Sequence, residues 1–316
     1  MILLLTLYAL FASTFILGEK AVALVAPIFF VGARMTLAGL LLLGYVAFFK
    51  KEKLMPLKEH AWWFVGIVVF HIYFSYVLEF ISYKYLSGSY VALMYNLSPF
   101  ITALFAFFFL TEIMTPKKWL GLVIGFVASL PMIISKASAT PTVPGIGSPL
   151  WINLAQISLL LSVIVTCIGW IFLKKITTTW NYSYVFVNGF GMFFGGLLSF
   201  VTSFFLEPWP TTALITGMPF WSLLLASVLI GNVIVYNLYG KLLHRYSATA
   251  LSLFGCTTPL FAAIIDWLWL GKTVGPLFLI TTVCTSFGLY LFYQEELVGT
   301  VTESGIVQEQ QKDLER

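Results

Sequence analysis

Long apolar runs separated by short polar segments make up almost the whole of this 316-residue chain. A helix needs about 20 apolar residues to cross a bilayer core of about 30 Å. Dividing the runs by that length predicts ten transmembrane helices, at residues 3–18, 27–49, 62–83, 87–110, 119–135, 152–173, 182–206, 220–240, 248–270 and 276–293. The pattern therefore predicts an all-α membrane protein embedded in a lipid bilayer.

The fourth and ninth runs repeat one pattern of hydroxyl and proline residues. Ser98 and Pro99 lie in the fourth run, and Thr258 and Pro259 lie at the matching place in the ninth. Two copies of one hydrophobic pattern indicate a duplicated membrane protein.

A short polar segment divides the two copies. Residues 136–150 are rich in Pro, Gly, Ser and Thr and do not continue a helix. We therefore expect a first five-helix repeat at 1–135, a linker at 136–150 and a second five-helix repeat at 151–294. Residues 295–316 are polar and are expected to form a cytoplasmic tail.

The basic residues fall unevenly on alternate sides of the predicted helices. One side carries Lys50, Lys51, Lys53, Lys58, Lys117, Lys118, Lys174, Lys175, Lys241 and Arg245, and the other carries only Lys20, Lys84, Lys136 and Lys272. Because cytoplasmic loops carry the excess of Lys and Arg, both termini are predicted to be cytoplasmic. Five helices per half is an odd number, so the second half enters the membrane in the opposite sense. Such inverted repeats are typical of secondary transporters.

Composition agrees with a membrane protein and narrows its partners. Hydrophobic residues make up 60% of the chain and charged residues only 9%, whereas soluble domains carry about 25% charged residues. The basic residues form short clusters between apolar runs and no basic domain, so no nucleic-acid partner is expected. The three cysteines lie inside apolar runs without metal-ligand spacing, which indicates neither a disulfide nor a metal site.

Motifs for phosphate binding or catalysis are absent from the sequence. It contains no G-x-x-x-x-G-K-[ST], no H-E-x-x-H and no G-x-S-x-G. No cofactor and no catalytic residue are therefore predicted, and direct ATP hydrolysis by this chain is unsupported.

The chain resembles the drug/metabolite transporter superfamily, in its EamA-type branch, which has ten helices in two inverted five-helix repeats. The residues that carry the resemblance are Ser13, Thr14 and Phe15 in the first helix, Pro27, Arg34 and Ala38 in the second, Pro99 and Glu112 in the fourth, and Gly121 and Gly125 in the fifth. The second half departs from the first, since the places of Glu112 and Arg34 fall on Lys272 and Asn188.

This resemblance implies a transporter of small organic molecules. Substrates in the superfamily include amino acids, nucleotide sugars, drugs and S-adenosylmethionine. The likeness to the S-adenosylmethionine transporter branch rests on no single residue of this chain.

Arg34 and Glu79 are predicted to lie inside transmembrane helices, in the outer half of the membrane. A charged residue at the centre of such a helix costs about 2.5–3.5 kcal/mol to insert, so charges within the membrane need a partner or a function. Two interpretations remain open. The residues could form a structural ion pair between the second and third helices. Alternatively, Glu79 could attract the ammonium group of a substrate while Arg34 receives its carboxylate.

Three other ionisable residues have simpler interpretations. Glu112 and Asp266 lie near helix ends, where an acid can pair with a lysine or reach the interface. His71 lies halfway along the third helix, and we expect a hydrogen bond from its ring to another helix rather than a proton relay. Proton coupling stays open.

Uncharged polar and aromatic residues from both halves complete the candidate substrate site. They are Tyr76, Tyr95, Asn96, Trp170, Asn188, Asn232 and Tyr236. Together they could line a cavity that offers hydrogen bonds and aromatic faces, which would suit an amino-acid-like or heteroaromatic solute. The alternative for each residue is ordinary helix packing.

These observations predict a secondary transporter of the bacterial inner membrane that moves a small polar organic metabolite by alternating access. The site residues suit an amino-acid-like or heteroaromatic solute, and the resemblance adds a nucleoside-containing solute such as S-adenosylmethionine as the best guess. Exchange, facilitated movement and proton coupling all stay open, and so does a homodimer. Drug efflux by the same fold is the first alternative, and a membrane-embedded enzyme is the second.

Overall fold

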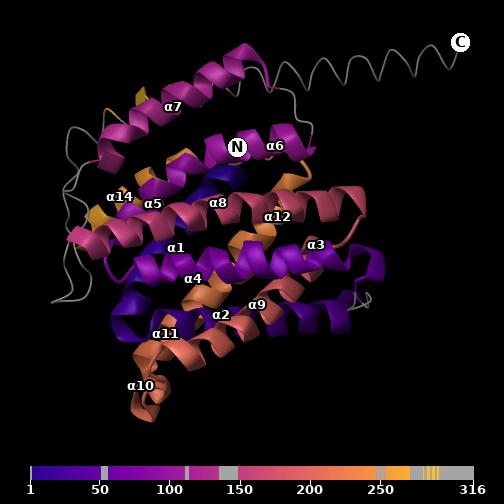
Figure 1. The fold of residues 1–316 in the computed structure, drawn as a ribbon, viewed down its shortest axis with the longest axis vertical. Helices are drawn as coiled ribbons and strands as arrows, with labels where there is room; N and C mark the ends of the chain where they lie inside the picture. Colours follow the sequence, from indigo (N-terminus) through magenta and orange to yellow (C-terminus); the bar gives the residue numbers. More distant parts are fainter. Residues whose placement is uncertain are drawn as a thin grey trace, which may run out of the picture.

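The structure, a computed structural model, describes residues 2–50, 56–110, 114–134, 149–246, 248, 251, 254–270, 280, 283–284, 287–288 and 290–291. Every regular element in these ranges is helical (Figure 1). Seven helices are long and apolar enough to cross a membrane: Ile2–Leu24, Pro27–Lys50, Lys58–Ser82, Tyr90–Phe109, Leu154–Thr179, Tyr184–Leu206 and Met218–Leu243. The predicted all-α membrane fold is therefore confirmed.

The remaining predicted spans are described only in part. Helix α7 (Pro116–Ile134) overlaps the predicted range 119–135, and α14 (Thr258–Leu270) covers only the second part of the predicted range 248–270. Of the last predicted span, 276–293, only residues 280, 283–284, 287–288 and 290–291 are described. Most of the linker and the whole polar tail lie outside the described residues.

Two helices extend further than the apolar runs predicted. Helix α1 (Ile2–Leu24) continues past Gly18 because Ala21 and Val22 of its last turns are buried. Helix α8 (Pro149–Thr179) continues past Lys174, whose long side chain can reach water without ending a helix.

Several crossings consist of successive helical segments of different pitch. In the first half they are α2 (Pro27–Tyr45) with η1 (Val46–Lys50), then η2 (Lys58–His60), α3 (Ala61–Gly66), η3 (Ile67–Phe74) and α4 (Ser75–Ser82), then α5 (Gly88–Met94), η4 (Tyr95–Leu97) and α6 (Ser98–Leu110). In the second half they are α11 (Met218–Ala226), η6 (Ser227–Val235) and α12 (Tyr236–Leu243), and then η7 (Gly255–Thr257) followed by α14. By contrast, α9 (Tyr184–Leu206) is continuous, and the short α10 (Thr212–Thr216) lies between two crossings.

The irregular segments recur at one spacing. The π-helices η3 and η6 begin at residues 67 and 227, the 3-10 turns η4 and η7 at 95 and 255, and α6 and α14 at 98 and 258, each 160 residues apart. A proline removes the hydrogen bond to the carbonyl four residues earlier. Pro99 and Pro259 therefore leave the carbonyls of Tyr95 and Gly255 without a helical donor, which accounts for a break at each place.

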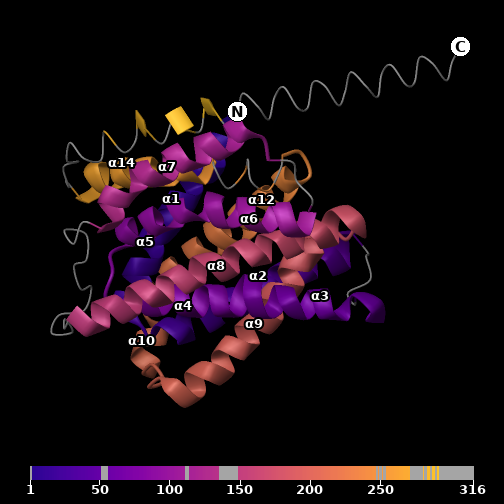
Figure 2. The same cartoon turned by 45° about the horizontal axis from the view of Figure 1, so that its top comes forward.

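Segments from both halves meet at the centre of the molecule. The turn η4 lies against η7, and α1 contacts α5, α14 and η6. Figure 2 shows α7 and α14 on one side of the molecule and α9 and α10 on the other, with α1 and α8 between them. The two helix breaks therefore face each other within the bundle.

Helices α2 and α9 form the closest helix pair between the halves, lying side by side along their lengths (Figure 1). Gly39 faces the backbone of Phe193 so closely that an added Cβ would overlap it, and a Cβ at Gly196 would reach Thr36. Small residues permit such close helix approach. Arg34 lies on α2 two residues before Thr36, so the contact between α2 and α9 helps to fix its position.

Gly191 and Gly195 have the G-x-x-x-G spacing that permits close helix approach. A Cβ at Gly191 would lie 2.6 Å from Cγ2 of Ile67, and one at Gly195 would lie 2.7 Å from Cγ2 of Ile72. These glycines therefore allow α9 to pack directly on the π-helix η3.

Candidate functional site

Arg34 is buried inside the bundle, with 2% of its surface exposed. Its Nε donates a 3.1 Å hydrogen bond to Oδ1 of Asn232 on η6. The guanidinium carbon lies 4.9 Å from the centre of the Tyr76 ring and 5.3 Å from that of Phe80, a cation–π arrangement. A Cβ at Gly231 would come within 3.1 Å of Nη2, so glycine at that position leaves room for the guanidinium.

The side chain of Asn232 is held by sulfur atoms on its other side. Its Nδ2 donates to Sδ of Met35 at 3.0 Å and to Sδ of Met192 at 3.8 Å. Thioether sulfur accepts only weakly, but these contacts direct the amide oxygen toward Arg34. Because Asn232 belongs to η6, the hydrogen-bond partner of Arg34 comes from the second half of the chain.

Glu79 on α4 is held by two tyrosine hydroxyls. Tyr83 donates to Oε1 at 3.0 Å, and Tyr95 donates to Oε2 at 2.6 Å. The carboxylate is 7% exposed, so these bonds replace most of its hydration. Because Tyr95 belongs to η4, one oxygen of Glu79 is tied to the first helix break.

Arg34 and Glu79 do not form an ion pair in the described part of the chain. Each is bonded to neutral groups, Arg34 to an amide and Glu79 to two phenols. They nevertheless line one cavity of about 20 Å³. Its other lining residues are Phe11, Thr14, Phe15, Ser75, Tyr76, Tyr95, Thr166 and Tyr236. We call it the charged cavity.

A second cavity of about 40 Å³ adjoins the first. It is lined by Tyr8, Phe11, Phe15, Tyr95, Ser98, Thr102, Thr166, Cys167, Trp170, Tyr239, Gly255 and Thr258. Trp170 stacks on Tyr239 with ring centres 3.9 Å apart. We call it the aromatic cavity, and it shares Phe11, Phe15, Tyr95 and Thr166 with the charged cavity.

Six of the nine predicted site residues line these cavities, and Asn232 and Asn188 each form a hydrogen bond with a lining residue. Arg34, Glu79, Tyr76, Tyr95 and Tyr236 line the charged cavity, Trp170 lines the aromatic cavity, and Asn232 bonds to Arg34. The rings of Tyr76 and Tyr236, which occupy matching positions in the two halves, lie 6.0 Å apart.

Like Asn232, the asparagines Asn188 and Asn96 line neither cavity. Asn188 donates from Nδ2 to the carbonyl of Tyr236 and to Oδ1 of Asn237, both at 3.3 Å, so it joins α9 to α12. Asn96 is 3% exposed, and its Oδ1 has no partner among the described residues.

The expectation for His71 was wrong. Both nitrogens of its ring lack a hydrogen-bond partner within the described ranges. The ring packs against Gly169, whose missing side chain lets α8 approach, and its centre lies 4.4 Å from that of Trp170 and 5.2 Å from that of Tyr236. Apolar atoms and aromatic rings therefore surround the imidazole.

The hydroxyl residues of the cavity walls were not among the predicted site residues, although Ser98 and Thr258 were noted as part of the repeat. Ser75 and Thr166 lie 2.5 Å apart between their hydroxyl oxygens, and Ser98 accepts a 3.6 Å bond at its carbonyl from Cys167. Thr14 lies on the same wall and was noted only as part of a family motif. Serine and threonine are common within membrane helices, so their facing toward a cavity gives no sequence signal.

Two acidic residues discussed above cannot be placed at the site. Glu112 and the side chain of Asp266 lie outside the described residues. Among those described, no group of three or more His, Cys, Asp and Glu could hold a metal ion.

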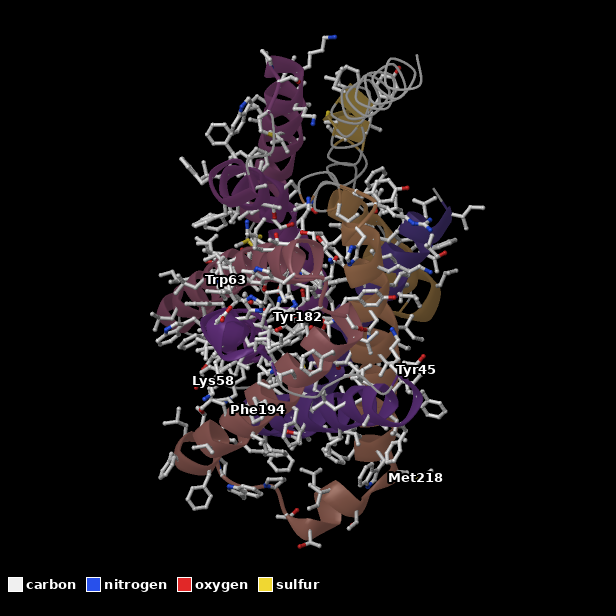
Figure 3. All side chains as sticks on the ribbon, turned by 90° about the vertical axis from the view of Figure 1, so that its right-hand side faces the viewer. Tyr45, Lys58, Trp63, Tyr182, Phe194 and Met218 are labelled. Atoms are coloured by element: carbon white, nitrogen blue, oxygen red, sulfur yellow. The ribbon has the colours of Figure 1, made fainter. Side chains whose placement is uncertain are left out.

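A larger hollow of about 600 Å³ lies at the end of the bundle rich in lysine. Figure 3 looks onto this end, where Lys58, Trp63 and Tyr182 are labelled. His60 stacks on Trp180 at 4.2 Å between ring centres and bonds through Nδ1 to the hydroxyl of Tyr182 at 3.0 Å. The hollow shares no described lining residue with either cavity, so side chains separate it from them.

These features define a membrane protein of several crossings with a buried charged site where two broken helices meet. The chain belongs to the EamA-like transporter family, which it matches over residues 1–134 and 153–294. It is therefore a membrane transporter with a small-molecule substrate.

Curated relatives have comparable length. An S-adenosylmethionine/S-adenosylhomocysteine transporter of Chlamydia trachomatis serovar L2 is 32% identical over 289 residues, covering 91% of this chain and 86% of that protein. The protein of the same name in Chlamydia muridarum is 31% identical over 289 residues, covering 91% and 89%. Protein PecM of Dickeya dadantii is 24% identical over 240 residues, covering 74% and 76%.

A solved crystal structure of another protein shares the fold. It superposes with a TM-score of 0.70, covering 93% of this chain and 97% of that one, at 15% sequence identity. At that identity the likeness concerns the fold alone.

Proposed function

We propose that this protein is a secondary transporter of the bacterial inner membrane, built from ten transmembrane helices in two inverted five-helix repeats at 1–135 and 151–294. The recurrence of helix breaks 160 residues apart supports the repeat. The two separate family matches support the same division. The lysine-rich end is the cytoplasmic end in this proposal, which places both termini in the cytoplasm.

The proposed substrate is a solute that carries an amino-acid group and a nucleoside, of the S-adenosylmethionine or S-adenosylhomocysteine type. One observation carries this proposal: Arg34 and Glu79 line one buried cavity without pairing with each other. An unpaired guanidinium and carboxylate complement the carboxylate and ammonium of an amino acid. The names of the Chlamydia relatives support the same class of solute.

Transport by alternating access fits the size of the cavities. Ligand sites usually measure about 300–1,000 Å³, whereas the two cavities here have volumes of about 20 and 40 Å³. They have room for water molecules but not for a metabolite, so the helices around them separate when a solute binds. The hollow near His60 is the cytoplasmic entrance in this proposal, and the closed layer between it and the cavities opens during the cycle.

The direct test is transport by the purified protein in proteoliposomes. Labelled S-adenosylmethionine is added outside, with S-adenosylhomocysteine, methionine or no solute inside. We expect uptake that is stimulated by internal S-adenosylhomocysteine. Vesicles that accumulate neither compound, and release neither when preloaded, would contradict the proposed substrate.

Variants connect that transport to the charged cavity. Glu79→Gln and Arg34→Ala should each reduce uptake at least tenfold while the protein still purifies as a folded species. Glu59→Gln and Arg245→Ala are matched controls, because both residues are exposed at the lysine-rich end. Full uptake by both cavity variants would remove Arg34 and Glu79 from the substrate site.

A further inference from the structure

We propose that the two cavities are two parts of one elongated binding site, with the amino-acid group of the solute in the charged cavity and its heteroaromatic base in the aromatic cavity. This inference rests on the proposed function, because it assigns positions to the two ends of that solute. The four shared residues Phe11, Phe15, Tyr95 and Thr166 form the partition that the solute crosses.

The distribution of charge sets the orientation. The lining residues of the charged cavity include Arg34 and Glu79, and those of the aromatic cavity include no Asp, Glu, Lys or Arg among the described residues. Placing the ammonium and carboxylate of the solute in the aromatic cavity would strip them of water without supplying opposite charges. The reverse orientation is therefore disfavoured.

The aromatic cavity has the groups that bind a nucleobase. Trp170 and Tyr239, stacked with ring centres 3.9 Å apart, both line it, and Tyr8 and Phe11 of α1 add two more aromatic rings. Hydroxyls of Ser98, Thr102 and Thr258 line the same space and can bond to the edge of a base. Aromatic faces combined with a few polar groups are typical of base-binding pockets.

The repeat relates the two cavities to each other. Tyr239 stands 160 positions after Glu79, the same spacing that relates the helix breaks. Glu79 lines the charged cavity and Tyr239 lines the aromatic cavity. Equivalent positions of the two halves thus provide a carboxylate at one cavity and an aromatic ring at the other, as a solute with two different ends requires.

The partition between the two cavities can open when one hydrogen bond, from Tyr95 to Glu79, is broken. Tyr95, whose ring centre lies 5.3 Å from that of Phe15, closes the partition while its hydroxyl bonds to Glu79. An ammonium group arriving at Glu79 offers a stronger, charged donor than a phenol. Binding of the amino-acid end therefore releases Tyr95 and joins the cavities.

The test pairs solutes that lack one end with variants that alter one cavity. Inhibition of the binding of labelled S-adenosylhomocysteine to the detergent-purified full chain is measured for three solutes. They are unlabelled S-adenosylhomocysteine, its decarboxylated form 5′-(3-aminopropylthio)-5′-deoxyadenosine, which lacks only the carboxylate, and S-ribosylhomocysteine, which lacks the base. The variants are Arg34→Gln for the charged cavity, and Trp170→Leu and Thr258→Val for the aromatic cavity. Thr258→Val preserves shape and so guards against misfolding of the tryptophan variant.

We expect the wild type to bind S-adenosylhomocysteine at least tenfold more tightly than either shortened solute. Arg34→Gln should abolish the preference over the decarboxylated compound and keep the preference over S-ribosylhomocysteine. Trp170→Leu should abolish the preference over S-ribosylhomocysteine and keep the preference over the decarboxylated compound. Thr258→Val should reduce only the preference over S-ribosylhomocysteine, by about threefold.

Two contrary results have different meanings. In the first, the wild type binds S-adenosylhomocysteine, but each variant loses both preferences to the same extent, or Arg34→Gln loses the preference over S-ribosylhomocysteine and Trp170→Leu the preference over the decarboxylated compound. The orientation is then wrong while the proposed function stands. If the wild type binds neither S-adenosylmethionine nor S-adenosylhomocysteine, the proposed function and the orientation are both overturned.

Discussion

The hydroxyl of Tyr95 donates a 2.6 Å hydrogen bond to Glu79 and thereby connects a buried carboxylate on α4 to the 3-10 turn η4. That turn faces its counterpart η7 from the second half. A ligand that takes the place of Tyr95 at Glu79 would therefore act directly on a helix break at the boundary between the halves.

Replacing Tyr95 by Phe removes one of the two donors to Glu79. A hydrogen bond to a charged group contributes about 1.5–3 kcal/mol, so the melting temperature in detergent should fall. Because the solute no longer has to displace the phenol, added S-adenosylhomocysteine should raise the melting temperature more than it does in the wild type.

Tyr83→Phe provides the comparison for that experiment. Tyr83 bonds to the other oxygen of Glu79, but it does not line either cavity. Its loss should lower the melting temperature without enlarging the shift on ligand binding. Equal ligand shifts in the two variants would show that Tyr95 has no special part in admitting the solute.

Asn232 should be required for positioning Arg34. Asn232→Leu leaves the buried guanidinium without its hydrogen-bond acceptor, at a cost of about 1.5–3 kcal/mol. Asn232→Asp instead supplies a carboxylate that pairs with Arg34. We expect the aspartate variant to be as stable as the wild type yet to lose uptake, because its guanidinium is no longer free for a substrate carboxylate. Melting temperature and uptake, measured together, separate the two effects.

The contact between α2 and α9 should tolerate no side chain at Gly39. Gly39→Ala places a Cβ onto the backbone of Phe193, and overpacking of this kind costs about 1–3 kcal/mol or more. Gly44→Ala is the matched control on the same helix, since no atom lies within 4 Å of its added Cβ. Alanine there should be neutral or stabilising by up to about 1 kcal/mol. A thermal-stability assay on both variants tests the difference.

Glu207, which lies in the second half of the chain, should stabilise the N-terminus of α2. Its two carboxylate oxygens accept from the backbone N–H groups of Ile28 at 3.0 Å and Phe29 at 2.9 Å. Loss of a capping group costs about 0.5–2 kcal/mol, so Glu207→Ala should lower the melting temperature by a few degrees, whereas the exposed Glu59→Ala should not. A smaller effect for Glu207 than for Glu59 would contradict this role.

The sequence predicts the large features of the fold because hydrophobic length and proline position act locally. Runs of about 20 apolar residues mark the crossings, and Pro99 and Pro259 mark the matched breaks. The π-helices η3 and η6 have no comparable signal, since one additional residue in a turn depends on packing with neighbouring helices.

The candidate site was predictable in its chemistry but not in its contacts. Buried charge is costly, which identified Arg34 and Glu79, yet the partner of Arg34 lies 198 residues away. Asn96 is adjacent to Tyr95 but lies outside both cavities, because neighbouring residues in a helical turn point in different directions. Side-chain direction across a helix break cannot be derived from sequence spacing alone.

The equivalent positions of Glu79 and Tyr239 have a consequence for how such proteins diverge. The duplicated backbone supplies two similar frameworks, and the side chains that line each cavity can change independently while the α2 and α9 contact is preserved. Selection for a new solute would then act on a few wall residues in one half. Relatives with nearly the same helices could in this way come to carry chemically unrelated cargo.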